Sequence, residues 1–188
     1  MKDPAFIQQM LLKGKEAGER VKAEFSNLSF QQINWKPLPD RWSIGQCLDH
    51  LIIADCSYFP ALKKITSGNY QMTAWQIWSP FSGLFGKILA DQLQEKVKGR
   101  LIKAPKVFTP SFSRLDAGIL NRFQKHLDTL LEYIAALKND DIDKIRITSP
   151  AAKFITYNLR HTVKILVPHL HRHINQAVRV KQEESFPG

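Results

Sequence analysis

Apolar residues recur at steps of three and four along most of this chain, and that spacing constrains its fold more than any other feature. It predicts amphipathic helices over residues 4–28, 43–66, 113–139 and 158–180. The third has a broad apolar stripe, which indicates burial against other helices. Convincing strand alternation is almost absent. We therefore predict an all-α protein built as a four-helix bundle.

Start and stop signals support these helices. Ser43 and Gln46 have the spacing of a capping box, in which each side chain bonds the backbone N–H of the other residue. Pro60 predicts a kink within the second helix. Asn158 is an acceptable N-cap for the last helix, and Pro168 is expected to bend that helix near its middle.

The connecting stretches have weaker patterns. Residues 29–41 show no sustained period and are interpreted as an ordered connection. Residues 70–110 form a partly helical insertion between helices two and three, with a short helix over about 81–95 and an extended link over 103–110. We expect this insertion to pack on the bundle; a lid over a pocket or a membrane-touching amphipath are the alternatives. Residues 140–150 are predicted to be a loop.

Length and composition suit a single domain. The 188 residues and the apolar content of 44% fit one globular core, so residues 1–188 are treated as one helical-bundle domain with a disordered tail over about 182–188. No window reaches eighteen uninterrupted apolar residues, and the N-terminus lacks the layout of a signal peptide. The sequence therefore predicts a cytoplasmic protein without a membrane span.

The net charge of +10 raises the question of a nucleic-acid partner. The densest basic run, residues 96–106, holds five cations but no aromatic residue on which bases can stack. We therefore expect a solvated basic surface and no nucleic-acid binding.

Three of the six histidines lie within residues 168–173, near the end of the last predicted helix. Because each helical residue turns by about 100°, His169 and His173 lie on one face about 6 Å apart, a geometry that suits metal chelation. His171 points away from that pair. A metal ion needs a further ligand from elsewhere in the chain, and His50 is the candidate. Histidines on a solvated face or in a satisfied core are the alternatives that this spacing leaves open.

The donor set indicates which kind of metal site to expect. Neutral imidazoles suit Zn or Ni, with Fe or Mn as further candidates, and three of them leave coordination positions open as in catalytic sites. An H-E-x-x-H metalloprotease helix is excluded, because Leu170, His171 and Arg172 separate the paired histidines. Cys47, one turn before His50, is either a fourth ligand that closes the site or a buried thiol.

Two blocks of the sequence resemble the DinB/YfiT-like superfamily of four-helix bundles, in its DinB-like branch. Residues 42–51 (WSIGQCLDHL) are similar to the W-S-I-x-x-x-x-x-H-L start of the second helix in that branch. Residues 169–176 (HLHRHINQ) are similar to its H-x-x-R-H-x-x-Q ending. The order and separation of the blocks also fit, so the resemblance spans roughly residues 29–180.

The resemblance implies a metal site and a class of function. In the superfamily, one histidine from helix two and a pair from helix four bind a divalent metal; here these are His50, His169 and His173. Similar proteins are described as metal-dependent hydrolases or as transferases that use low-molecular-weight thiols. A small-molecule substrate, with or without such a thiol, is therefore expected.

Other residues are expected to support the histidines. Gln46, Asp49, Asp55 and Gln176 are candidates for orienting the imidazoles through hydrogen bonds, and Trp42 is a candidate wall of an apolar pocket.

A non-catalytic protein is the rival hypothesis. Such a bundle would keep a structural or vestigial metal site and act through partner binding or as a homodimer, and an exposed aromatic patch in the insertion would support it. His126, near the edge of the third helical stripe, is expected to be a surface or boundary residue.

Overall fold

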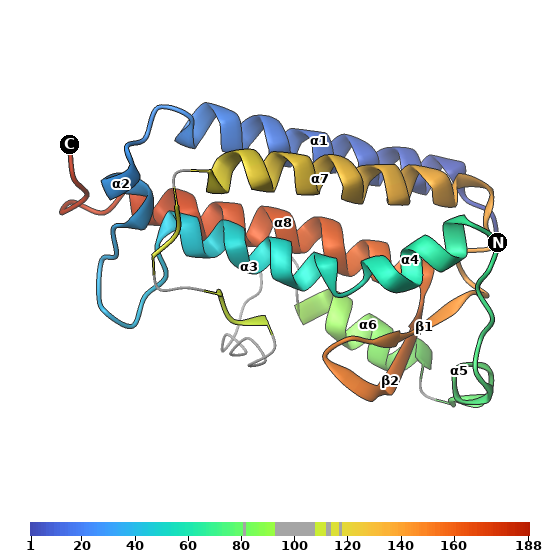
Figure 1. Ribbon diagram of the computed structural model, residues 1–188. Helices are drawn as coiled ribbons and strands as arrows, with labels where there is room; N and C mark the ends of the chain where they lie inside the picture. Colours follow the sequence, from blue (N-terminus) through green and yellow to red (C-terminus); the bar gives the residue numbers. More distant parts are fainter. Residues whose placement is uncertain (81, 93–107, 112–113, 117) are drawn as a thin grey trace.

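The computed structural model describes residues 1–80, 82–92, 108–111, 114–116 and 118–188. Its body consists of four long helices, α1 (Pro4–Phe25), α3 (Ile44–Cys56), α7 (Ile119–Ala136) and α8 (Leu159–Lys181). Helix α1 packs against α7 and α8, and α3 packs against the same two helices (Figure 1). The predicted all-α four-helix bundle is confirmed.

The core lies between these four helices. Phe25, Leu51, Phe123 and Ile174 come from different helices, and each is fully buried at 0% exposure. These residues belong to the apolar stripes that the three- and four-residue spacing predicts. None of the helices in the described residues is both long and apolar enough to cross a membrane.

Side-chain caps begin two of the long helices where the sequence predicts them. Ser43 Oγ accepts the Gln46 N–H at 3.1 Å, and Gln46 Oε1 accepts the Ser43 N–H at 3.3 Å. The Asn158 side chain accepts the His161 N–H at 2.9 Å at the start of α8. Helix α8 continues through Pro168, and the expected bend there stays a prediction.

The second and third predicted helices are shorter than expected. Helix α3 ends at Cys56, and a separate helix, α4 (Phe59–Thr66), follows after a short turn. Pro60 lies in the first turn of α4, where its missing N–H costs no helical hydrogen bond, so it starts a helix instead of kinking one. Helix α7 begins at Ile119, and a 3₁₀ turn, η2 (Leu137–Asn139), follows it.

A β-hairpin replaces part of the predicted loop. Strand β1 (Arg146–Ser149) pairs antiparallel with β2 (Ala152–Asn158), with Ile147 opposite Tyr157. The adjacent residues Thr156 and Tyr157 are both fully buried. Thr156 bonds Ser82 of the insertion at 2.6 Å, whereas Tyr157 bonds Tyr58 at 2.8 Å. Because both faces of this strand are covered near its end, its sequence lacks the alternation that identifies half-buried strands.

The insertion between helices two and three is partly helical, as predicted. It contains α5 (Ala74–Trp78) and α6 (Ser82–Gln92), and α6 packs against β2 and α8 (Figure 1). A further short helix, α2 (Phe30–Asn34), lies in the connection before α3. The basic run at 96–106 and most of the predicted link at 103–110 lie outside the described residues.

The C-terminal residues make specific contacts where a disordered tail was expected. The Phe186 ring lies 5.5 Å from the Trp35 ring in an edge-on arrangement. Gln32 donates a hydrogen bond to the Pro187 carbonyl oxygen at 3.0 Å. These contacts join the end of the chain to α2 and to the connection that follows it, a pairing of distant segments that local composition does not indicate.

Candidate metal centre

Three histidines converge between α3 and α8. His50 on α3 is 2% exposed, and His169 and His173 on α8 are each 8% exposed. One ligand nitrogen from each ring lies within 4.8 Å of the other two. The structure therefore brings together the three histidines that spacing and resemblance single out.

The spacing of the nitrogens fits a metal ion. His50 Nε2 lies 3.3 Å from His169 Nε2. Two nitrogens bound at about 2.0–2.1 Å to a tetrahedral zinc ion lie roughly 3.3–3.4 Å apart. Together with His173 they form a neutral nitrogen donor set that suits Zn or Ni. This group can hold a divalent metal ion.

Hydrogen bonds orient two of the three rings. His50 Nδ1 donates to the Phe108 carbonyl oxygen. His173 Nδ1 donates to Gln176 Oε1 at 3.0 Å. A neutral imidazole that donates from Nδ1 carries its lone pair on Nε2. The Nε2 atoms of both rings are therefore the ones available to a metal.

Burial keeps the three imidazoles neutral. It lowers the pKa of His169 to about 3, with smaller contributions from the nearby His50 and Arg172. Burial also lowers the pKa of His173 well below its ordinary value and lowers that of His50. Neutral imidazole is the form that binds metal ions, so this environment prepares the site for a cation.

Trp42 lies directly against the histidines. Its ring centre is 4.8 Å from that of His50 and 5.8 Å, in a stacked arrangement, from that of His173. It therefore forms part of the wall, as expected for a pocket residue. The other three tryptophans, Trp35, Trp75 and Trp78, are not among the described residues that line the cavity.

Asp49 and Gln46 support the site indirectly, through hydrogen bonds between their side chains and backbone N–H groups. Asp49 Oδ2 accepts the Ser111 N–H at 2.7 Å and so anchors the segment whose Phe108 carbonyl orients His50. Gln46 belongs to the cap of α3. The contact with Phe108 was not expected, since a backbone carbonyl group carries no side-chain signal in a sequence.

The histidines open onto a cavity of about 850 Å³. Its lining follows α8 from Ile165 and Leu166, past His169, to Gln176 and Arg179 near the C-terminal end of the helix. A cavity of this size accommodates a small organic molecule.

Cys47, the candidate fourth ligand, and His171, which is expected to point away, both lie outside the histidine group. Cys47 is fully buried, and burial raises the pKa of its thiol to about 12. Its sulfur is not part of the group of ligand atoms that His50, His169 and His173 form. His171 Nε2 donates to the Lys13 carbonyl oxygen at 2.9 Å, on the side of α8 that faces α1. These positions favour a site of three histidines.

His126 is buried, in contrast to its predicted position at the surface or boundary. It is only 8% exposed, and its Nε2 donates to Asp55 Oδ2 at 3.2 Å. Its ring also stacks on Phe59 at 5.1 Å. The expectation of a surface or boundary residue is wrong, because the end of α3 and the start of α4 cover this side of α7. Asp55 consequently pairs with His126.

Comparisons with known proteins agree with this architecture. The family model for the DinB superfamily matches residues 15–177. The uncharacterized protein YuaE of Bacillus subtilis (strain 168) is 25% identical over 164 residues, which cover 85% of this chain and 90% of that relative. No solved structure matches the chain. With its bundle and its family match over most of its length, the chain belongs to the DinB superfamily.

Proposed function

We propose that this protein is a metal-dependent enzyme that acts on a small molecule, either as a hydrolase or as a transferase that uses a low-molecular-weight thiol. The observation that carries the proposal is the convergence of three buried, neutral imidazoles, His50, His169 and His173, on the wall of a cavity of about 850 Å³. Zn or Ni fits these donors best, with Fe or Mn as alternatives. We place this activity in the cytoplasm.

In this proposal, the residues around the histidines orient the imidazole rings and shield them from water. A divalent metal ion held by His50, His169 and His173 would supply Lewis acidity, which would lower the pKa of water or of a thiol and polarise an electrophilic carbonyl group. The Phe108 carbonyl and Gln176 keep the lone pairs of two imidazoles on Nε2. Trp42 shields the rings from water on one side. Three protein ligands leave coordination positions for a substrate.

Metal analysis tests the first part of this proposal. Protein purified without chelators and supplied with Zn²⁺ or Ni²⁺ is expected to retain about one ion per chain by mass spectrometry. His50→Ala and His173→Ala should lose that ion, whereas the matched control His171→Ala should keep it, because His171 faces α1. A wild-type protein that retains neither of these metals, nor Fe²⁺ or Mn²⁺ supplied in the same way, would rule the proposal out.

A second measurement separates an enzyme from a structural metal site. In the Co²⁺-substituted protein, 2-mercaptoethanol should add a sulfur-to-cobalt charge-transfer band if a coordination position is open. A spectrum that does not respond indicates a closed, structural site.

A non-catalytic role is the second candidate, and exposed apolar side chains favour it. Trp78 is 81% exposed, Phe154 66% and Trp75 51%. Trp75 Nε1 donates to the Phe154 carbonyl oxygen at 3.1 Å, so at least two of these residues are neighbours. Such a patch would suit a homodimer or another partner. A wild type that elutes as a dimer in size-exclusion chromatography, together with a Trp78→Ala variant that elutes as a monomer at the same concentration, would support this candidate.

A further inference from the structure

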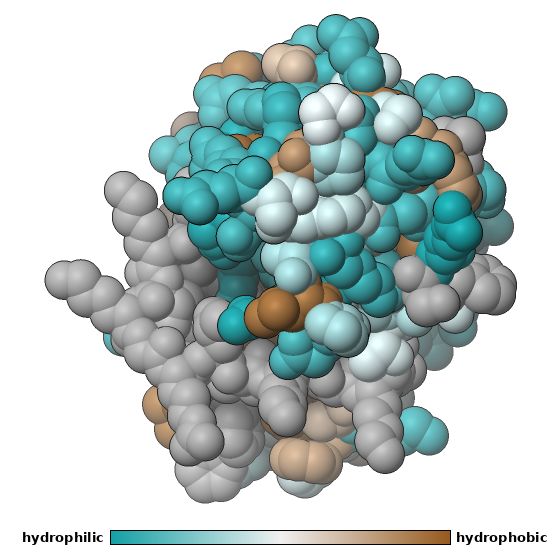
Figure 2. Space-filling model, turned by 90° about the vertical axis from the view of Figure 1, so that its left-hand side faces the viewer, coloured by the Kyte–Doolittle hydropathy of each residue, from teal (hydrophilic) through white to brown (hydrophobic). Residues whose placement is uncertain are grey.

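The cavity wall changes character along α8. Near the start of the helix the lining is apolar, with Ile165 and Leu166. Beyond the histidines it becomes polar and cationic, with Arg172, Gln176 and Arg179. Figure 2 looks onto the end of the molecule where the C-terminal end of α8 lies, and hydrophilic side chains predominate there. A ligand in this cavity therefore meets positive charge on one side of the histidines.

Arg172 lines the same cavity as the three histidines, directly precedes His173 in α8 and is half-buried. A half-buried charge is screened by solvent less than an exposed one. Arg172 therefore places a partly shielded positive charge in the wall of the cavity that the histidines share.

Arg179 extends this positive wall. It lies seven residues after Arg172, which is about two helical turns or roughly 10 Å along the same face. Like Arg172, Arg179 lines the cavity. Like charges brought near each other repel, and an anion between or beside them relieves that repulsion.

Three carboxylates also line the cavity, and one of them, Asp55, is buried and accepts a hydrogen bond from His126. Asp40 and Glu183 are exposed, so water and salt screen them. Among the residues that the structure describes, no ion pair joins Arg179 to a carboxylate. The outer part of the cavity consequently keeps a positive character.

We propose that Arg172, assisted by Arg179, binds a carboxylate or similar oxyanion of the ligand whose reactive group lies at the three histidines. This inference rests on the proposed function and narrows it to an anionic small molecule, such as a low-molecular-weight thiol that carries a carboxylate. The planar guanidinium donates two parallel N–H bonds to an oxyanion, which gives direction as well as affinity. A thiol of similar size with a positively charged end group should bind more weakly, because the arginines repel that charge.

Three thiols that share the same two-methylene spacer test this selectivity. The probes are 3-mercaptopropionate, 2-mercaptoethanol and cysteamine, whose ends are anionic, neutral and cationic. Each is titrated into the Co²⁺-loaded protein at low salt while the sulfur-to-cobalt band is followed. We expect 3-mercaptopropionate to bind about tenfold or more tightly than 2-mercaptoethanol, and cysteamine to bind weakest, since a hydrogen bond to a charged group is worth roughly that factor.

Variants assign the preference to the proposed residue. Arg172→Gln should bring the three dissociation constants together while the bound cobalt is unchanged. Arg122→Gln is the matched control, because Arg122 is exposed, pairs with Asp116 and is not among the residues that line the cavity. Equal affinities in the wild type, or a preference for 3-mercaptopropionate that survives Arg172→Gln, would overturn the inference.

Calorimetry of the metal-free protein separates this inference from the proposed function. The arginines do not need a metal ion, so the order of 3-mercaptopropionate over cysteamine should persist there, with weaker affinities. If cobalt does not bind but this order is seen and depends on Arg172, the anion site stands and the metal-dependent function fails. If cobalt binds and neither form of the protein prefers the anionic thiol, the anion site is rejected and the metal site stands.

Discussion

At the scale of single residues, Asp55 is the most constrained charged group that the structure describes. Its side chain is fully buried, and Oδ2 accepts a hydrogen bond from His126. Its other oxygen, Oδ1, has no hydrogen-bond partner among the described residues. Burial raises the pKa of this carboxyl group, although His126 acts in the opposite direction. The stability of this part of the bundle therefore depends on His126.

We predict that His126→Ala lowers the free energy of unfolding by about 3 kcal/mol, because it leaves a buried carboxyl group without its partner. Urea denaturation measures the change. Asp55→Ala combined with His126→Ala should cost less than the sum of the two single changes. The matched control His171→Ala should change stability little, and additive losses would argue against a coupled pair.

At the scale of elements, α6 can approach the hairpin and α8 closely because Gly86 has no side chain. A Cβ atom added at Gly86 would lie 2.7 Å from Tyr157 Cβ and 2.7 Å from His161 Nδ1. Tyr157 is fully buried and cannot move aside. At Gly83 on the same helix, an added Cβ would meet no atom within 4 Å. The short helix was predicted from its sequence, but the need for glycine at one position and not at the other depends on its neighbours.

We predict opposite effects for the two alanine substitutions in α6. Gly86→Ala should destabilise the packing of α6 by about 1–3 kcal/mol through overcrowding. Gly83→Ala should be neutral or stabilise the helix by up to about 1 kcal/mol, since alanine has the higher helix propensity. Amide hydrogen exchange within α6 reports both changes. Equal protection in the two variants would contradict the close packing at Gly86.

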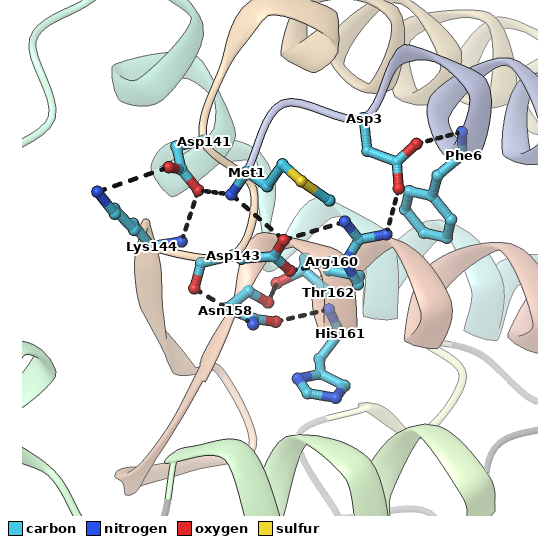
Figure 3. A network of polar contacts seen from close by, with 10 residues as sticks. All are labelled: Met1, Asp3, Phe6, Asp141, Asp143, Lys144, Asn158, Arg160, His161 and Thr162. Carbon is cyan, nitrogen blue, oxygen red and sulfur yellow. Dashed lines mark hydrogen bonds and ion pairs between the residues drawn. The ribbon is translucent and has the colours of Figure 1, made fainter.

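At the scale of the whole molecule, one arginine joins distant parts of the chain. Arg160 at the start of α8 donates to both oxygens of Asp143, at 2.6 and 3.0 Å, and to Asp3 Oδ2 at 2.8 Å (Figure 3). Asp3 also caps α1 by accepting the Phe6 N–H at 3.0 Å. The network thus connects the N-terminal helix, the segment before the hairpin and the last helix.

This network should make stability depend on pH in the acid range. Arg160 lowers the pKa of Asp143 from 3.8 to about 2. The folded state therefore holds the ionised carboxylate more strongly than the unfolded state. The resulting stabilisation is complete above about pH 4 and is lost as the pH falls towards about 2.

Asp143→Asn tests that dependence by thermal denaturation at several pH values. The variant should be less stable by about 1 kcal/mol at pH 7, a modest value because the Asp143 side chain is 34% exposed. The difference from the wild type should disappear near pH 2. Asp116→Asn is the control, since that carboxylate is 68% exposed and its removal should matter little. A difference that stays constant from pH 7 to pH 2 would contradict the assignment.

The sequence by itself determined the four long helices, the caps at Ser43 and Asn158 and the histidines that form the candidate site. These features are local, because helical periodicity, capping and the i, i+4 spacing involve residues within one or two turns. His50 was the candidate third ligand from the sequence, and the resemblance supported its place beside the pair on the last helix. A strand that is covered on both faces lacks the alternation of apolar and polar residues by which strands are recognised in a sequence, so the hairpin was not predicted.

Only the tertiary structure decided which distant groups meet. The pairing of His126 with Asp55, the Phe108 carbonyl on His50, the packing of Phe186 on Trp35 and the positive wall at Arg172 each join segments that are separate in the chain or depend on the cavity around them. Their partners are selected by packing of the whole core, and a buried polar group takes whichever partner that packing brings within hydrogen-bond distance. Such choices are not encoded in the spacing of neighbouring residues.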